Sequence, residues 1–258
     1  MPLRLMTLNL KLWERSQSLH PHAETRHPPM GKKETMACHD HISLVRRRST
    51  LVPSLLAAML LSLLPWSGTA VAHGSVVDPA TRNYGCWQRW GSNHLDPSMA
   101  QQDPMCWQAW QANPNAMWNW NGLYRNGSGG NFQAAVPDGQ LCSGGRTEGG
   151  RYNSLDAVGA WKTTDIASDF TVKLYDQASH GADYFLVYVS RQGFDPTTQP
   201  LRWSDLQLVA RTGRYGPSQN YSIPVSTSGY SGRHIVYTIW QASHMDQTYF
   251  LCSDVNFR

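Results

Sequence analysis

Glutamate is almost missing from residues 73–258, where Glu148 is the only one and lies in a glycine-rich stretch. An enzyme that hydrolyses glycosidic bonds with two carboxylates would need aspartates in both roles, and no convincing aspartate pair occurs. These residues also lack an excess of positive charge, because thirteen lysines and arginines stand against fourteen aspartates and glutamates. A nucleic-acid partner requires a basic surface, so the composition argues against one.

A CxxC pair is also absent, which disfavours a zinc site built on thiolates. Of the five cysteines, Cys38 lies near the N-terminus, and Cys86, Cys106, Cys142 and Cys252 remain as an even number. In an oxidising compartment two disulfides are the default. The sequence leaves three pairings open, and we favour Cys86–Cys106 and Cys142–Cys252. The second would close a long loop and give the larger stabilisation, on the order of several kcal/mol.

A long uninterrupted apolar run is missing too, since Pro53 and Pro65 bracket the apolar part of LVPSLLAAMLLSLLPW, and that part is short for a membrane span. This stretch follows VRRRST and precedes AVA, the order of regions in a secretory signal peptide. We therefore interpret residues 1–72 as a leader that is cut after Ala72, with Met36 as the better start site. Residues 73–258 are expected to form one exported, extracellular domain that has no membrane segment and is a monomer.

Cleavage at this position would make His73 the first residue of the exported chain. A terminal histidine offers a metal two nitrogens, the α-amine and one imidazole nitrogen. The α-amine has a pKa near 8, so it can lose its proton to a metal at modest cost.

The pattern of apolar and polar residues changes at Asp169. Residues 83–161 are rich in Gly, Asn, Pro and Trp and show little alternation, which predicts loops and short helices such as a turn or two in CWQAW. After Asp169, the runs FTVKLYD, YFLVYVS, LQLVAR, YSIPV, HIVYTIWQA and TYFLCSDVNF alternate apolar and polar residues. With GSVVDP as a first strand, this pattern predicts an all-β, antiparallel sandwich.

Five histidines lie in the expected domain, namely His73, His94, His180, His234 and His244. Adding one imidazole to the two nitrogens of His73 would give three nitrogens in a T-shaped plane, which suits copper. The tetrapeptide QASH occurs twice, ending at His180 and at His244, and each copy lies in a break between strand-like runs. Spacing alone does not decide which of these two histidines would be the second ligand.

Four motifs carry a resemblance to a known family: HGSVVDPATRNYGC, VPDGQLCSGG, DQASHGADYFLVYVSRQGFDP and the terminal QTYFLCSDVNF. They resemble the bacterial lytic polysaccharide monooxygenases of auxiliary activity family 10, formerly called chitin-binding proteins, and within it the cellulose-active actinobacterial branch. The resemblance runs from His73 to about Phe257. It implies an immunoglobulin- or fibronectin III-like β-sandwich with a large loop and short-helix region between the first strands.

The resemblance implies that His73 and His180 hold one copper ion, because His180 precedes the strand and turn that match the family. His244 lies near the last strand, where the family has no ligand, and is expected to be a polar neighbour.

The family places an aromatic residue at the axial position of the copper, which maps to Tyr249 where most members have Phe. Phe250 is expected to point to the opposite face of its strand and pack in the core. Gln247 stands where many relatives have Glu, and a neutral amide cannot transfer a proton as a carboxyl can. Ala178 corresponds to a small residue that crowds the solvent-facing axial position.

Contacts with a polysaccharide are expected from exposed aromatic rings, which can stack on sugar C–H groups. AMWNWNGLY matches the family segment that bears such a ring, which implies Trp118 with Asn119 as a polar partner for sugar hydroxyls. Tyr152 aligns with a second surface aromatic across a difference of two residues in length.

The function implied by the resemblance is copper-dependent oxidative cleavage of crystalline cellulose at C1 or C4, and of chitin as another candidate substrate. It requires an external reductant and O2 or H2O2. A protein that only binds cellulose or chitin is the alternative, and a secreted sandwich with a structural role is a third. A free His73 discriminates between them, because a binding protein has no reason to expose it.

Overall fold

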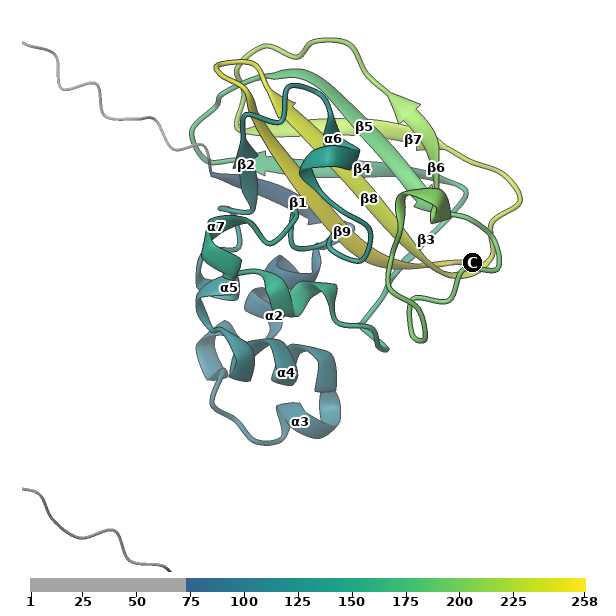
Figure 1. Cartoon of the computed structure of the whole chain (residues 1–258). Helices are drawn as coiled ribbons and strands as arrows, with labels where there is room; N and C mark the ends of the chain where they lie inside the picture. Colours follow the sequence, from purple (N-terminus) through teal and green to yellow (C-terminus); the bar gives the residue numbers. More distant parts are fainter. Residues whose placement is uncertain (1–72) are drawn as a thin grey trace, which may run out of the picture. The chain divides into compact units, whose positions relative to one another are not determined.

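The structure, a computed structural model of the chain, describes residues 73–258 (Figure 1). The predicted leader, with its start at Met36 and its cut after Ala72, lies outside the described residues. Within residues 73–258, no helix combines the length and apolar character that crossing a bilayer requires.

Two β-sheets form a sandwich, as predicted (Figure 1). The smaller sheet has the order β1-β4-β7, and all its pairs are antiparallel. The larger sheet has the order β2-β9-β8-β5-β6, and β3 adds to β9 as a parallel partner. The strands are β1 (Gly74–Asp78), β2 (Tyr124–Asn126), β3 (Thr164–Ile166), β4 (Asp169–Asp176), β5 (Ala182–Ser190), β6 (Leu206–Arg211), β7 (Asn220–Ser226), β8 (Gly232–Ala242) and β9 (Gln247–Phe257).

The smaller sheet shows the alternation that the sequence predicts. In β7, Tyr221, Ile223 and Val225 are buried and the residues between them are exposed, because successive side chains of a strand point to opposite faces. Val172 of β4 lies directly opposite Ile223 in the antiparallel register. This sheet therefore presents one apolar face to the larger sheet and one polar face to water.

Strands β8 and β9 are buried on both faces, and this gives the molecule two hydrophobic cores. Trp240 and Tyr249 belong to the core between the two sheets. Ile239 and Phe250, which pair in the register, point the other way into a core covered by the helical region. The expected core position of Phe250 is confirmed.

The region between β1 and β3 consists mostly of short helices and loops, as predicted, with the short strand β2 among them. The disulfide Cys86–Cys106 joins α2 to α4 within it. Its helices are α2 (Arg82–Trp90), α3 (Met99–Gln102), α4 (Pro104–Ala112), α5 (Asn115–Trp118), α6 (Phe132–Ala135) and α7 (Thr147–Gly150), with 3-10 turns η1 (Gly91–Asn93) and η2 (Asn153–Asp156). A further 3-10 turn, η3 (Trp203–Asp205), lies between β5 and β6.

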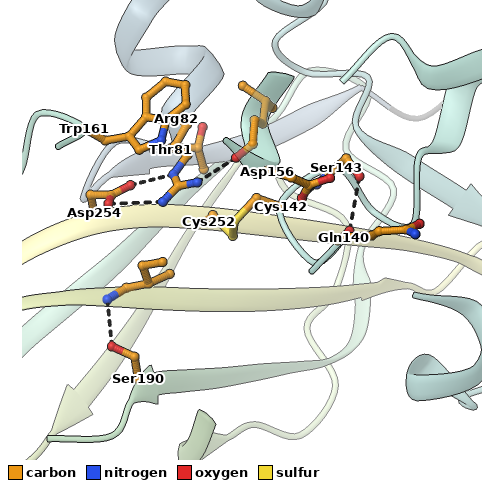
Figure 2. The surroundings of a disulfide bond; sticks show 12 residues. Thr81, Arg82, Gln140, Cys142, Ser143, Asp156, Trp161, Ser190, Cys252 and Asp254 are labelled. Carbon is orange, nitrogen blue, oxygen red and sulfur yellow. Dashed lines mark hydrogen bonds and ion pairs between the residues drawn. A yellow bond between two sulfur atoms is a disulfide. The ribbon is translucent and has the colours of Figure 1, made fainter. Parts of the chain in front are cut away.

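Two long-range connections fasten this region to β9 (Figure 2). Arg82 at the start of α2 donates to both carboxylate oxygens of Asp254 at 2.7 and 3.2 Å, and the ring of Trp161 covers its guanidinium group. The disulfide Cys142–Cys252 makes the second connection, so both expected pairings are confirmed. A buried charge is tolerated when it is paired and hydrogen-bonded, and the bidentate geometry provides this.

Candidate metal centre

The pairing of β1 with β4 holds the backbone of His73 in place. The N–H of Gln177 donates to the carbonyl oxygen of His73 at 2.8 Å, and the N–H of Gly74 donates to the carbonyl oxygen of Asn121 at 2.7 Å. A Cβ at Gly74 would lie 2.7 Å from the ring of Trp240, so only glycine allows this close approach. The backbone of His73 therefore lies beside Gln177, which is three residues before His180 in the sequence.

His180 ends a tight turn that follows β4. Asp176, the last residue of β4, accepts hydrogen bonds from the N–H of Ala178 at 3.1 Å, the N–H of His180 at 2.5 Å and the His180 Nδ1 at 2.9 Å. Ser179 and Gly181 have φ values of 57° and 81°, which turn the chain sharply on either side of His180. Ala178 is exposed on this turn.

The other ring nitrogen of His180 is free to bind a metal. His180 is only 9% exposed, and its Nε2 is shielded from water without a hydrogen-bond partner among the described residues. A buried polar atom without a partner is costly, and coordination of a metal would satisfy it. The donor set therefore fits a metal that imidazole binds well, such as copper.

His244 lies against His180, with the two ring centroids 4.2 Å apart. The fold thus brings both QASH copies together, and His244 is a neighbour of His180, as expected. Partial burial, and then the charge of His180, lower the pKa of His244 below its ordinary value. His244 is exposed in a bend that follows β8, and among residues 73–258 no carboxylate contacts its ring as Asp176 contacts His180.

The other two histidines have structural surroundings. The Nδ1 of His234 lies 2.7 Å from the carbonyl oxygen of Ser190, and His94 packs among tryptophans. Within residues 73–258, no group of three or more His, Cys, Asp or Glu side chains is arranged to hold a metal ion. A centre at His73 and His180 would therefore have two imidazoles, and a third nitrogen would have to come from the main chain.

Tyr249 and Gln247 lie side by side on one face of β9. The ring of Tyr249 stacks on Trp240 with centroids 4.3 Å apart, and its hydroxyl donates to Gln247 Oε1 at 3.4 Å. The Nε2 of Gln247 donates in turn to Asn126 Oδ1 on β2 at 3.2 Å. Burial, and then the nearby charge of Asp176, raise the pKa of Tyr249 well above its ordinary range, so the phenol stays protonated.

Trp118 is 45% exposed at the end of α5, as an aromatic surface residue should be. Its ring meets His94 and Trp110 edge to face, with centroids 5.2 and 5.1 Å away. Asn119 is half-buried, and its side-chain amide donates to the carbonyl oxygen of Asn115 at 3.0 Å. These contacts hold the tryptophan ring in one orientation.

The prediction of Tyr152 as a second surface aromatic is wrong. Its side chain is 0% exposed, and its hydroxyl donates to the carbonyl oxygen of Asn119 at 2.8 Å. Gly149 and Gly150, both with positive φ, turn the preceding chain, and Tyr152 packs with Leu155 in the core below the helical region. Burial raises the pKa of Tyr152 to about 12. Tyr152 thus supports Asn119 from beneath.

Three residues of this region were not predicted: Asp176 beneath His180, Asn126 beside Gln247, and His94 against Trp118. The sequence carries a signal only for Asp176. An aspartate precedes the first QASH, whereas Trp240 precedes the second.

The comparison with protein families identifies one model that covers most of the described chain. The model described as "Lytic polysaccharide mono-oxygenase, cellulose-degrading" matches residues 73–255. Among curated proteins, chitin-binding protein CbpD of Pseudomonas aeruginosa is 34% identical over an alignment of 219 residues, and the match covers 79% of this chain. The matched part is 52% of CbpD, so the chain spans about half the length of this relative.

Solved structures agree with this comparison. A lytic polysaccharide monooxygenase from Kitasatospora papulosa is 83% identical with a TM-score of 0.72, and the match covers 72% of this chain and 98% of that one. CelS2, described as a cellulose-active monooxygenase in complex with copper, is 28% identical with a TM-score of 0.61 and matches 72% of this chain and 99% of its own. The chain therefore belongs to the lytic polysaccharide mono-oxygenase family, a family of oxidoreductases.

Proposed function

We propose that this chain is a secreted, copper-dependent monooxygenase that cleaves glycosidic bonds at the surface of crystalline cellulose by oxidation at C1, C4 or both. The observation that carries the proposal is the buried Nε2 of His180, which has no hydrogen-bond partner within residues 73–258, on the segment that pairs with the strand after His73. Membership of a family described as cellulose-degrading supports cellulose as substrate, and chitin stands as the candidate to test beside it. The copper in the CelS2 structure supports the choice of metal.

His73 and His180 are the residues that would hold the copper. Cleavage after Ala72 would free the α-amine of His73, so that this residue gives two nitrogens and His180 Nε2 gives the third. Bound copper would supply one-electron redox chemistry that, with an external reductant and O2 or H2O2, oxidises a C–H bond next to the glycosidic linkage.

The surrounding side chains shape this centre. Tyr249 stays protonated and stacked on Trp240, so it would offer a neutral phenol beside a bound copper. Gln247 is an amide that can donate or accept a hydrogen bond and cannot transfer a proton as a carboxyl would. The small side chain of Ala178 is exposed and would crowd the solvent-facing side.

The substrate would lie on the exposed ring of Trp118. A flat aromatic ring can stack on the apolar faces of glucose units, and Asn119 lies beside it as a polar partner for sugar hydroxyls. Trp118 would serve a binding protein equally well, so the metal chemistry must distinguish the two functions.

The test compares the chain that begins at His73 with a chain that carries one extra alanine before His73. Both are loaded with copper and incubated with cellulose or chitin and ascorbate, and soluble products are analysed by mass spectrometry. We expect oxidised oligosaccharides from the first protein and none from the second, with equal adsorption to cellulose. Equal product yields would contradict the role of the amine, and adsorption without oxidised products from either protein would favour a non-catalytic binding protein.

A further inference from the structure

We propose that Asp176 is a positioning residue that fixes the tautomer and direction of His180, so that Nε2 is the nitrogen presented to a metal. This inference rests on the proposed function in assigning the metal to His180, although its first test needs no metal. Asp176 has no contact of its own with the proposed metal position.

Every side-chain hydrogen bond of Asp176 goes to the turn that carries His180. Its Oδ1 accepts from the N–H of Ala178 and contacts His180 Nδ1, and its Oδ2 accepts from the N–H of His180. The carboxylate is 0% exposed, and His180 is the only basic side chain in contact with it among residues 73–258. A buried carboxylate with this set of partners is dedicated to holding the turn.

The chemistry of the two groups sets the tautomer. An ionised carboxylate can only accept hydrogen bonds, so the proton on a neutral His180 ring must lie on Nδ1. The lone pair then lies on Nε2, the buried nitrogen for which the described part of the chain provides no hydrogen-bond partner. A hydrogen bond at one ring nitrogen is the usual way in which a protein selects the nitrogen that binds a metal.

The same short segment also holds the other proposed ligand. The N–H of Gln177, next to Asp176, donates to the carbonyl oxygen of His73 at 2.8 Å, and Asp176 lies opposite Gly74 in the strand register. The N–H of Asp176 itself donates to the carbonyl oxygen of Gln219 at 2.8 Å, which anchors Asp176 to the segment just before β7. Asp176 holds the His180 turn, and the adjacent Gln177 holds the backbone of His73, so one short segment contacts both histidines.

The second QASH copy provides an internal comparison. Trp240 occupies the position before it, and its side chain packs in the core between the two sheets. His244 therefore lacks the carboxylate that Asp176 gives to His180, although the two rings are in contact. The residue before each tetrapeptide, Asp176 or Trp240, thus determines that the His180 ring is oriented by a carboxylate and the His244 ring is not.

The test starts with the metal-free, wild-type chain that begins at His73. Nitrogen-15 NMR of the histidine rings should show His180 with a proton on Nδ1 and a bare Nε2. A proton on Nε2 in this protein would overturn the proposal, whatever the variants do. The Nδ1–H form together with a failure to oxidise polysaccharide would contradict the proposed function and leave the role of Asp176 standing.

The variant Asp176→Asn then tests the consequence for the metal. An amide has one acceptor oxygen and one donor NH2 group. In either orientation of the asparagine, its NH2 group would therefore face one of the N–H groups that donate to Asp176 in the wild type. We expect Cu(II) to bind about 10- to 100-fold more weakly, as is typical when a partner behind a metal ligand is lost. The reduction potential of the copper should rise, because a buried negative charge stabilises Cu(II) over Cu(I).

Asp183→Asn is the matched control, because it removes one negative charge from an exposed residue at the start of β5, in an ion pair with Arg214. It should leave the copper affinity and the potential unchanged. A wild-type affinity and potential in Asp176→Asn would overturn the proposal. If that variant does not fold by circular dichroism, the wild-type NMR measurement decides.

Discussion

Replacing Asp156 with asparagine should stabilise the protein at neutral pH. Asp156 lies beside the Cys142–Cys252 disulfide (Figure 2), and the N–H of Ser143 donates to its Oδ1 at 2.9 Å. Burial nevertheless raises the pKa of Asp156 from 3.8 to about 6, because the surroundings disfavour the ionised form. Asparagine keeps the acceptor oxygen for Ser143 and removes the charge.

The sign follows from proton binding. Between about pH 4 and pH 6 the native protein holds a proton on Asp156 that the unfolded chain has released, so this group lowers the free energy of unfolding as the pH rises. The loss is complete above the folded pKa. About two pKa units correspond to about 3 kcal/mol, and partial exposure of this carboxyl reduces the expected effect to about 1–2 kcal/mol.

Thermal unfolding of the wild type and Asp156→Asn between pH 4 and pH 8 measures this effect. The two proteins should have similar Tm values at pH 4, and at pH 7.5 the variant should melt about 2–8 °C higher. The exposed Asp183→Asn serves again as the control and should show no such divergence. A difference in Tm that is independent of pH, or a variant that is less stable at pH 7.5, would refute the reasoning.

The remaining predictions concern the metal centre and the substrate surface. His180→Ala should weaken Cu(II) binding by more than about 100-fold in isothermal titration calorimetry, since a direct ligand contributes more than a partner behind it, and His244→Ala should change it far less; the reverse ranking would place the ligand in the other QASH copy. Trp118→Ala should weaken adsorption to cellulose by about 0.5–1.5 kcal/mol, the scale of one aromatic contact. Tyr152→Phe should leave adsorption unchanged and lower the free energy of unfolding by about 1 kcal/mol, because it removes one buried hydrogen bond, and a loss of adsorption would return Tyr152 to the substrate surface.

The strands could be predicted wherever the sequence alternates. β4 and β7 each have one face in the core and one in water, so apolar residues recur at every second position. β2 and β3 were not predicted, because three residues are too few to show a period. The helix α2 was also not predicted as such, since RNYGCWQRW contains a glycine and several aromatic residues and its stability comes from packing.

The candidate site was predicted in part. The positions of Tyr249 and Phe250 on opposite faces follow from strand geometry, and both cysteine pairings are confirmed. Tyr152 was misplaced, because the direction of a side chain in an irregular segment depends on positive-φ turns that residue types alone do not fix. The contact of Asp176 with His180 is local in sequence, yet its importance is evident only once both are seen to be buried.

The burial of β8 and β9 on both faces has a consequence for how the protein unfolds. Because β9 contributes alternate side chains to each core, loss of packing in one core would also disturb the strand that the other core packs against. The helical region and the sandwich should therefore melt in a single cooperative transition, with no intermediate that retains one half.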